Sequence, residues 1–223
     1  MNSDSSATSI PSRSIPRTPL RDEVYRHLLD RIHRGELPPG VRVRDTVLAT
    51  QLGVSRTPVR EALLRLTRDG VLEGDMGRGF RLRPLAREEI REVGAILGAL
   101  EALAFQLSPD FPEDRLDRLV EIDRKLEQTR GDVAACLDLE DEWHRVLLTG
   151  CPNRRLLDLI SGLRQVPRRY LSAYMRAAGR LTLSTAPHGK VLHALRQDDR
   201  SAALKVFELQ WRRGIAELEA WIA

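Results

Sequence analysis

The sequence has few of the residues that build small secreted or membrane-bound proteins. Only 4% of its 223 residues are aromatic, and Cys136 and Cys151 are its two cysteines. Two isolated thiols make neither a disulfide framework nor a zinc knuckle, and they fit a reducing compartment. No apolar stretch approaches the roughly 20 residues that cross a bilayer, and the N-terminus lacks the continuous apolar segment of a secretory signal. These absences predict a cytoplasmic protein that makes no use of a membrane.

Aliphatic residues and an uneven distribution of charge are what the chain does have. Hydrophobic residues make up 42% of it, and a core with so few aromatic rings favours helices. The length suits two compact domains. The net charge is +4, but residues 1–85 carry an excess of about five positive charges. Such a basic part is typical of a module that meets a polyanion, although an ordinary Arg-rich surface gives the same excess.

The N-terminal part divides into a tail and a small domain. Residues 1–18 are rich in Ser, Thr and Pro and cannot build a core, so we expect a disordered tail. Apolar residues then take helical spacing, and Asp45 and Ser55 are expected to cap the second and third helices. The segment 71–84 has the pattern of a β-hairpin with a Gly-rich turn. The sequence therefore predicts a winged helix-turn-helix domain over residues 19–84.

Residues 85–223 show helical periodicity and no strand pattern. The breaks between apolar segments predict six helices, near 87–108, 112–129, 132–149, 154–178, 184–197 and 199–222. Six helices of this length form an antiparallel bundle large enough to hold a pocket. The predicted fold class is thus mostly α, with an all-helical domain for dimerisation and for binding a small-molecule effector.

The third predicted helix has the features of a DNA-reading helix. In a helix-turn-helix unit the second helix of the pair enters the major groove, and its first residues meet the base edges. Arg56 and Arg60 are four positions apart and share a face, where two guanidinium groups suit bidentate contacts to guanine. The alternative is that both arginines are solvated or paired with Glu61 and Asp69.

Further residues around this helix suit contacts to the DNA backbone. The hydroxyls of Ser55 and Thr57, together with the N–H groups at the helix start, suit phosphate. Gly77 and Gly79 let the tip of the hairpin approach DNA closely. Arg78, which lies between them, is placed to reach the minor groove or a phosphate.

The most characteristic run of this region is VSRTPVREAL at 54–63, followed by DGVLE at 69–73. With LPPG at 37–40 and a GRG turn, it makes residues 18–84 resemble the winged-helix domain of the GntR family of transcription regulators. The resemblance covers essentially the whole domain. It implies that the chain binds an operator in double-stranded DNA, and a two-fold operator calls for a homodimer. Bundle faces such as that of Leu103 would supply the dimer interface.

The same resemblance assigns roles to single residues. Arg56 and Arg60 match the recognition-helix arginines, and Gly77 matches the wing-tip glycine. A further basic contact is common at the start of the second helix of this family. Here that position is Thr46, so the contact is missing unless Arg44 replaces it.

A potential metal site lies in the second half. Glu140 and His144 are four positions apart in a helix, so an acid and an imidazole share one face, and His188 follows in a later helix. Such side chains can hold one metal ion. The alternative is a metal-free pocket in which the histidines bond each other, the acid or water. The other histidines, His27, His33 and His193, are interpreted as surface residues.

The segments LEDEWHRVLLTGCPNRRLLDLI (139–160) and PHGKVLHALRQDDRSAA (187–203) resemble the FadR-type subgroup of this family and its FCD effector domain. That domain binds a divalent metal through an Asp-x-x-x-His pair and two further histidines, and its effectors are commonly small organic acids. The aligned positions here are Glu140, His144, His188 and Gln210. Glu thus replaces Asp and Gln replaces His, so a site for zinc or nickel has an altered ligand set.

A second departure concerns the acid anchor. The family often has an Arg four residues before the Glu of its LxALE motif, where this chain has Leu97. Arg164 or Arg168 would then have to bind an acidic effector. The resemblance predicts an effector-controlled regulator of the repressor type and no enzyme. The alternatives are a constitutive DNA binder with a vestigial pocket and a metal-dependent enzyme.

Overall fold

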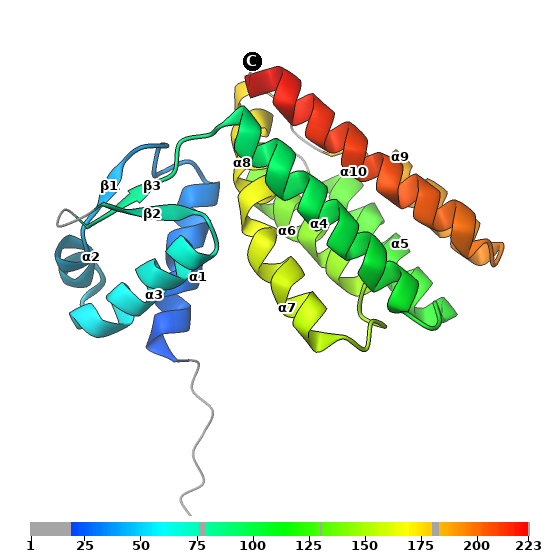
Figure 1. Ribbon diagram of the computed structural model, residues 1–223, viewed down its shortest axis with the longest axis horizontal. Coiled ribbons are helices and arrows are strands. Elements are labelled where there is room, and N and C mark those ends of the chain that lie inside the picture. Colours follow the sequence, from blue (N-terminus) through cyan, green and yellow to red (C-terminus); the bar gives the residue numbers. More distant parts are fainter. Residues whose placement is uncertain (1–18, 76–78, 130, 180–182, 223) are drawn as a thin grey trace, which may run out of the picture.

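The computed structural model describes residues 19–75, 79–129, 131–179 and 183–222. The first half consists of three helices and a small sheet (Figure 1). Its elements are α1 (Leu20–His33), β1 (Arg42–Val43), α2 (Asp45–Leu52), α3 (Arg56–Arg68), β2 (Leu72–Asp75) and β3 (Gly79–Leu82). The strands form an antiparallel sheet in the order β1-β3-β2.

The core of the first half is aliphatic, as its composition predicts. Its fully buried side chains come from one face each of α1 and α3 and from the sheet, and they include Leu28, Val59, Leu63, Leu66 and Leu82. Apolar residues three or four positions apart on a helix share a face, which explains the packing of α1 against α3.

The short strand β1 was not predicted. It pairs with β3, with Val43 opposite Phe80. At the start of β3, Gly79 has a φ of +100°, and a Cβ there would lie 2.9 Å from the carbonyl oxygen of Val43. Both the backbone conformation and the close approach therefore require glycine. Asp45 also differs from its prediction, since it is the first residue of α2 and Arg44 occupies the cap position.

The second half is an all-helical bundle, so the predicted fold class is confirmed. Its helices are α4 (Arg87–Leu107), α5 (Glu113–Gln128), α6 (Val133–Leu147), α7 (Arg154–Leu163), α8 (Gln165–Ala177), α9 (Ala186–Arg196) and α10 (Arg200–Ile222). Figure 1 shows α4 and α10 packed side by side, and α8 on the side of the bundle that faces α1. Among the described helices, none combines the length and apolar character that spanning a membrane requires.

The helix predicted over 154–178 is in fact two helices, α7 and α8, which meet at Arg164. Pro167 explains the break, because it has no N–H to donate to the carbonyl of Leu163 four positions earlier. The interruption turns the chain so that α8 can face the first half. It also places Arg164 at the junction, in the interior of the bundle.

Candidate functional site

Arg56 and Arg60 project from the first turns of α3 and converge on one carboxylate. Their guanidinium groups lie 3.2 and 3.3 Å from Oδ2 of Asp45 on α2, and both side chains are more than 60% exposed. Burial alone would raise the pKa of Asp45, but hydrogen bonds from Arg56, Arg60 and a backbone N–H hold it below its usual range. The acidic partner is thus Asp45, whereas the alternative considered from the sequence was pairing with Glu61 and Asp69.

The other residues expected to contact DNA are solvent-exposed around this pair. They are Arg44, Thr46, Ser55 and Thr57. Arg44 lies beside Gly79, whose Cβ position is 3.7 Å from the Cα of Arg44, so it connects the start of α2 with the base of the hairpin. Gly77 and Arg78 lie outside the described residues.

Glu140, His144 and His188 come together inside the bundle. One carboxylate oxygen of Glu140 lies 3.5 Å from Nε2 of His144, and the other lies 3.6 Å from Nε2 of His188. One potential ligand atom from each residue lies within 4.8 Å of the others. Burial disfavours charge on His188, but Glu140 and Asp123 raise its pKa to about 9. Burial likewise disfavours charge on Glu140, and the two histidines nevertheless hold its pKa well below the usual range.

Each histidine is oriented by a second carboxylate. Nδ1 of His144 lies 2.7 Å from Glu101, and Nδ1 of His188 lies 2.7 Å from Asp123. Both Nε2 atoms are thereby directed toward Glu140. A histidine that binds a metal through one nitrogen almost always bonds such a group through the other. The ring of Trp143 stacks on His188, with 3.8 Å between ring centroids, and fixes its plane.

Gln210 on α10 lines the same cavity as Glu140 and His144. Its Oε1 is buried and has no hydrogen-bond partner among the described residues. A buried acceptor without a donor is costly, so this oxygen is available to a metal ion or to a donating group of a ligand. An orphaned oxygen, a carboxylate and two directed imidazoles fit a divalent cation, although this donor set is harder than one with three histidines.

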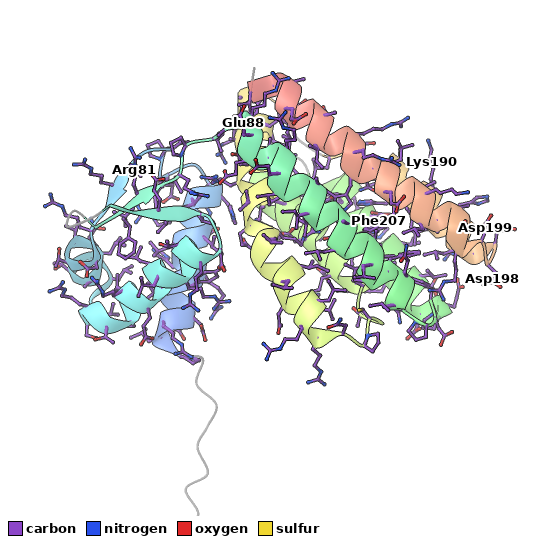
Figure 2. The ribbon with its side chains drawn as sticks, in the orientation of Figure 1. Arg81, Glu88, Lys190, Asp198, Asp199 and Phe207 are labelled. Atoms are coloured by element: carbon purple, nitrogen blue, oxygen red, sulfur yellow. The ribbon has the colours of Figure 1, made fainter. Side chains whose placement is uncertain are left out.

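Glu140 and His144 of this cluster line a cavity of about 540 Å³. Helices α4, α6, α8, α9 and α10 all contribute to its lining. Leu97, which occupies the place of the expected arginine, is fully buried in this wall. Figure 2 shows Phe207 on α10 turned toward the bundle, where its ring lies 5.5 Å from that of His144.

Arg164 and Arg168 do line the cavity, but carboxylates already hold both. Arg164 donates to Glu101 and, at 2.9 Å, to Asp141. Arg168 donates to the other oxygen of Asp141 and to Asp138. Burial alone would lower the pKa of Arg164, but these carboxylates raise it, so its charge is permanent. Neither guanidinium is free for an acidic ligand.

Arg168 also reaches the first half of the chain. Its Nε donates to Nδ1 of His33, the last residue of α1, over 2.9 Å. His33 is 4% exposed, so the interpretation of it as a surface residue is wrong, whereas His27 is exposed as expected. The side chains of Ser172 and Arg176 donate to the backbone carbonyl of His33. These bonds satisfy a carbonyl at the end of α1, where positive charge is favourable.

A second contact of α8 holds the chain between the two halves. The hydroxyl of Tyr170 accepts the backbone N–H of Ala86 over 2.8 Å and donates to Glu89. Arg169 donates to the carbonyl of Arg83 and to Glu89. Figure 2 shows this passage between Arg81 on the sheet and Glu88 at the start of α4. Helix α8 therefore contacts the cavity, α1 and the connecting segment.

Sequence reasoning missed the two orienting carboxylates, although the pattern contains a signal for both. Glu101 falls in the apolar stripe of α4 formed by Leu97, Ala104 and Phe105, and Asp123 falls in the stripe of α5. A charged residue at a buried stripe position requires a partner. The positions therefore mark a buried polar site, but they do not reveal which histidine each carboxylate meets.

An exposed pair of arginines on a helix-turn-helix unit, joined to a bundle with a ligand-sized cavity, defines a DNA-binding regulator with a ligand-binding domain. Residues 20–82 match the model for bacterial regulatory proteins of the gntR family, and residues 92–208 match the model for the FCD domain. The chain belongs to the GntR family of bacterial transcription regulators and has an FCD effector-binding domain.

Solved structures agree with this assignment. E. coli McbR/YncC is 25% identical, with a TM-score of 0.80 over 93% of this chain and 100% of that one. A GntR family member from Pseudomonas syringae pv. tomato str. DC3000 is 28% identical, with a TM-score of 0.56 over 91% and 86%. A GntR regulator from Rhodococcus sp. RHA1 is 20% identical and shares the fold, with a TM-score of 0.74 over 90% and 98%. No curated protein sequence matches the chain.

Proposed function

We propose that the protein is a cytoplasmic repressor that binds operator DNA as a homodimer through α3 and is released by a small molecule in the cavity. Residues 19–84 would form the DNA-binding domain, and residues 85–223 the sensor. The observation that carries this proposal is that α8 contacts both the cavity and the DNA-binding half. The same helix lines the cavity through Arg168 and bonds the end of α1 through His33.

Continuous hydrogen bonds connect the metal-ligand cluster with the DNA-binding half. His144 bonds Glu101, Glu101 bonds Arg164, and Arg164 bonds Asp141. Asp141 then bonds Arg168, and Arg168 bonds His33. We call these six residues the relay. A ligand that moves His144 or Arg164 has to rearrange the relay, because a buried charge left without its partner is costly.

The relay also sets the expected sign of control. All the hydrogen bonds of the relay are present in the structure, and α1 packs against α8. Helix α1 packs on α3, which carries Arg56 and Arg60. A ligand that displaces α8 would therefore also shift α1, against which the recognition helix α3 packs. The expected result is loss of operator binding, as in a repressor.

Base reading is assigned to Arg56 and Arg60, with Ser55, Thr57 and Arg44 as candidates for phosphate contacts. Arg60→Ala should cost about 1–3 kcal/mol per half-site on an operator selected from random DNA, and much less on non-specific DNA. Arg68→Ala is the matched control. It removes an exposed arginine from the far end of the same helix, so it should leave specific binding almost unchanged. An equal loss on both kinds of DNA for Arg60→Ala would refute the assignment.

A divalent metal ion, zinc or nickel, is proposed for the cluster. Glu140, His144 and His188 would hold it, with the oxygen of Gln210 as a fourth donor. The ion would supply a positive charge that binds an acidic or otherwise electron-rich group of the effector. Support comes from the directed Nε2 atoms and the orphaned oxygen. Because Arg164 and Arg168 are already paired, the carboxylate of an organic acid would depend on this ion.

The dimer interface is proposed to lie on α4 and α7. Ile96, Leu103 and Leu107 on α4 are 40–52% exposed, with Leu100 half-buried between them, and Leu159 on α7 is 58% exposed. The α4 positions are separated by four, three and four residues, which is the spacing of a helix that packs against another helix. Exposed leucines on adjoining helices are the expected signature of a surface covered by a second copy.

The matched families and folds are those of transcription regulators, and we propose no catalytic role for the cluster. Its carboxylate, that of Glu140, lies between the two imidazoles, and each imidazole is held by a further carboxylate. These bonds suit a site that holds an ion in place rather than one that moves protons.

A further inference from the structure

The cavity has two chemically different parts. One part is formed by Glu140, His144 and Gln210, which are polar groups of the proposed metal site. The remaining wall is mainly apolar, and most of it comes from α4, α8 and α10, with further residues from α6 and α9. It includes Ile90, Leu97, Leu171, Val206, Ile215 and Leu218. A ligand that fills the cavity therefore needs a polar head and a larger apolar body.

The apolar part is long. On α10 the lining positions beyond Gln210 continue to Leu218, which at about 1.5 Å per residue corresponds to roughly 12 Å. The volume of about 540 Å³ lies in the range of pockets that enclose drug-sized ligands. A small dicarboxylic acid bound at the polar end would leave most of this wall without contact.

Charges in the lining also disfavour a small polyacid. Arg164 and Arg168 are saturated by Glu101, Asp141 and Asp138. A second carboxylate of the ligand that lay against the aliphatic side chains would be buried without a partner, which is strongly unfavourable. Lys190 and Arg213 also line the cavity, but both are exposed. They can attract an acidic head from solvent without binding it strongly.

We propose that the effector is an elongated amphiphile, with one polar head at Glu140, His144 and Gln210 and an apolar tail between α4, α8 and α10. This inference rests on the proposed function, because it names the ligand class of the same cavity. The head is either a carboxylate on the metal ion or a hydroxyl that donates to the orphaned oxygen of Gln210. Both heads place the tail in the same aliphatic wall.

Titration calorimetry with the full-length protein tests whether the apolar tail of the ligand contributes to its affinity. Butanoate, hexanoate, octanoate and octanol are the probes, and succinate and citrate represent small polyacids. Each methylene that enters the wall should raise affinity about fourfold, with one probe bound per chain. Comparing octanoate with octanol, each with and without added zinc, identifies the head. Tighter binding of succinate or citrate than of octanoate, or no dependence on chain length, would overturn the proposal.

Gly214→Leu blocks the tail without removing an existing contact. Gly214 lines the cavity in the middle of α10, and a Cβ there meets no atom within 4 Å. Leu is also the better helix former, so the variant should fold. It should lose most of the gain between butanoate and octanoate while keeping its metal content. Gly189→Leu on α9 is the control, because its Cβ also meets nothing and it does not line the cavity. Equal binding by both variants would overturn the placement of the tail.

DNA binding distinguishes this proposal from the function on which it rests. If octanoate binds with the expected dependence on chain length but leaves operator affinity unchanged, the ligand class stands and effector control fails. If succinate or citrate releases the operator and octanoate does not, effector control stands and the ligand class is wrong.

Discussion

Lowering the pH should reduce the free energy of unfolding, because His33 is buried where the two halves of the protein meet. Burial, and then the charge of Arg168, lower the pKa of His33 from its ordinary 6.5 to about 3. The unfolded chain therefore takes up a proton below about pH 6.5, where the folded chain does not. The stability from neutral His33 is complete above that pH and is lost as the pH falls toward 3. At 1.36 kcal/mol per pH unit, lowering the pH from about 7 to about 5 removes about 2 kcal/mol.

Urea unfolding of the wild type and of His33→Asn at both pH values measures this loss. The side-chain oxygen of Asn can accept the hydrogen bond from Nε of Arg168 and does not titrate. Every other titrating group is shared by the two proteins, so the difference between their pH dependences belongs to His33. The wild type should lose about 2 kcal/mol more than the variant over this range. The same pH dependence in both proteins would refute the reasoning, as would an NMR titration in which His33 protonates near pH 6.

Three further outcomes follow from the proposed function. Leu103→Glu should turn the dimer into a monomer in sedimentation, whereas Val120→Glu, an equally exposed position on α5, should not; a dimer in both would place the interface elsewhere. Gln210→His should raise zinc or nickel affinity, measured by mass spectrometry of protein purified without a chelating column, and no gain together with no metal in the wild type favours a metal-free pocket. Arg168→Met should reduce the effect of a ligand on operator affinity several-fold while leaving ligand affinity nearly unchanged, with the exposed Arg145→Met as control; full coupling in Arg168→Met would show that the relay does not carry control.

The sequence predicted elements whose information is local. Helix α3 begins after Ser55 and buries Val59, Leu63 and Leu66, because their spacing defines one face and the motif defines the start. The break at Arg164 was missed although Pro167 is visible in the sequence. Pro is tolerated in the first turn of a helix, so the pattern alone did not show whether the helix ends or continues through it.

The relay depends on tertiary contacts, so the sequence could indicate some of its buried residues but not their partners. His33 continues a row formed by Tyr25 and Leu29, four positions apart along α1, and this second buried row indicates a partner beside the core. The identity of that partner, α8, depends on packing between halves that are far apart in the sequence. The same limit applies to Asp45, which was interpreted as a helix cap while its side chain holds Arg56 and Arg60.

The chemistry of Glu101 explains how a site whose buried arginines Arg164 and Arg168 are already paired can still transmit a signal. This carboxylate is fully buried and binds His144, Arg164 and, at 2.9 Å, the indole N–H of Trp211. Burial would raise its pKa, but the charges and hydrogen bonds of Arg164 and His144 lower it to about 2, so it stays ionised. A metal ion on His144 would draw this carboxylate toward the imidazole and weaken its hold on Arg164. A ligand that changes the charge at His144 would therefore change the strength of the hydrogen bonds along the relay, the last of which is made by His33 at the end of α1.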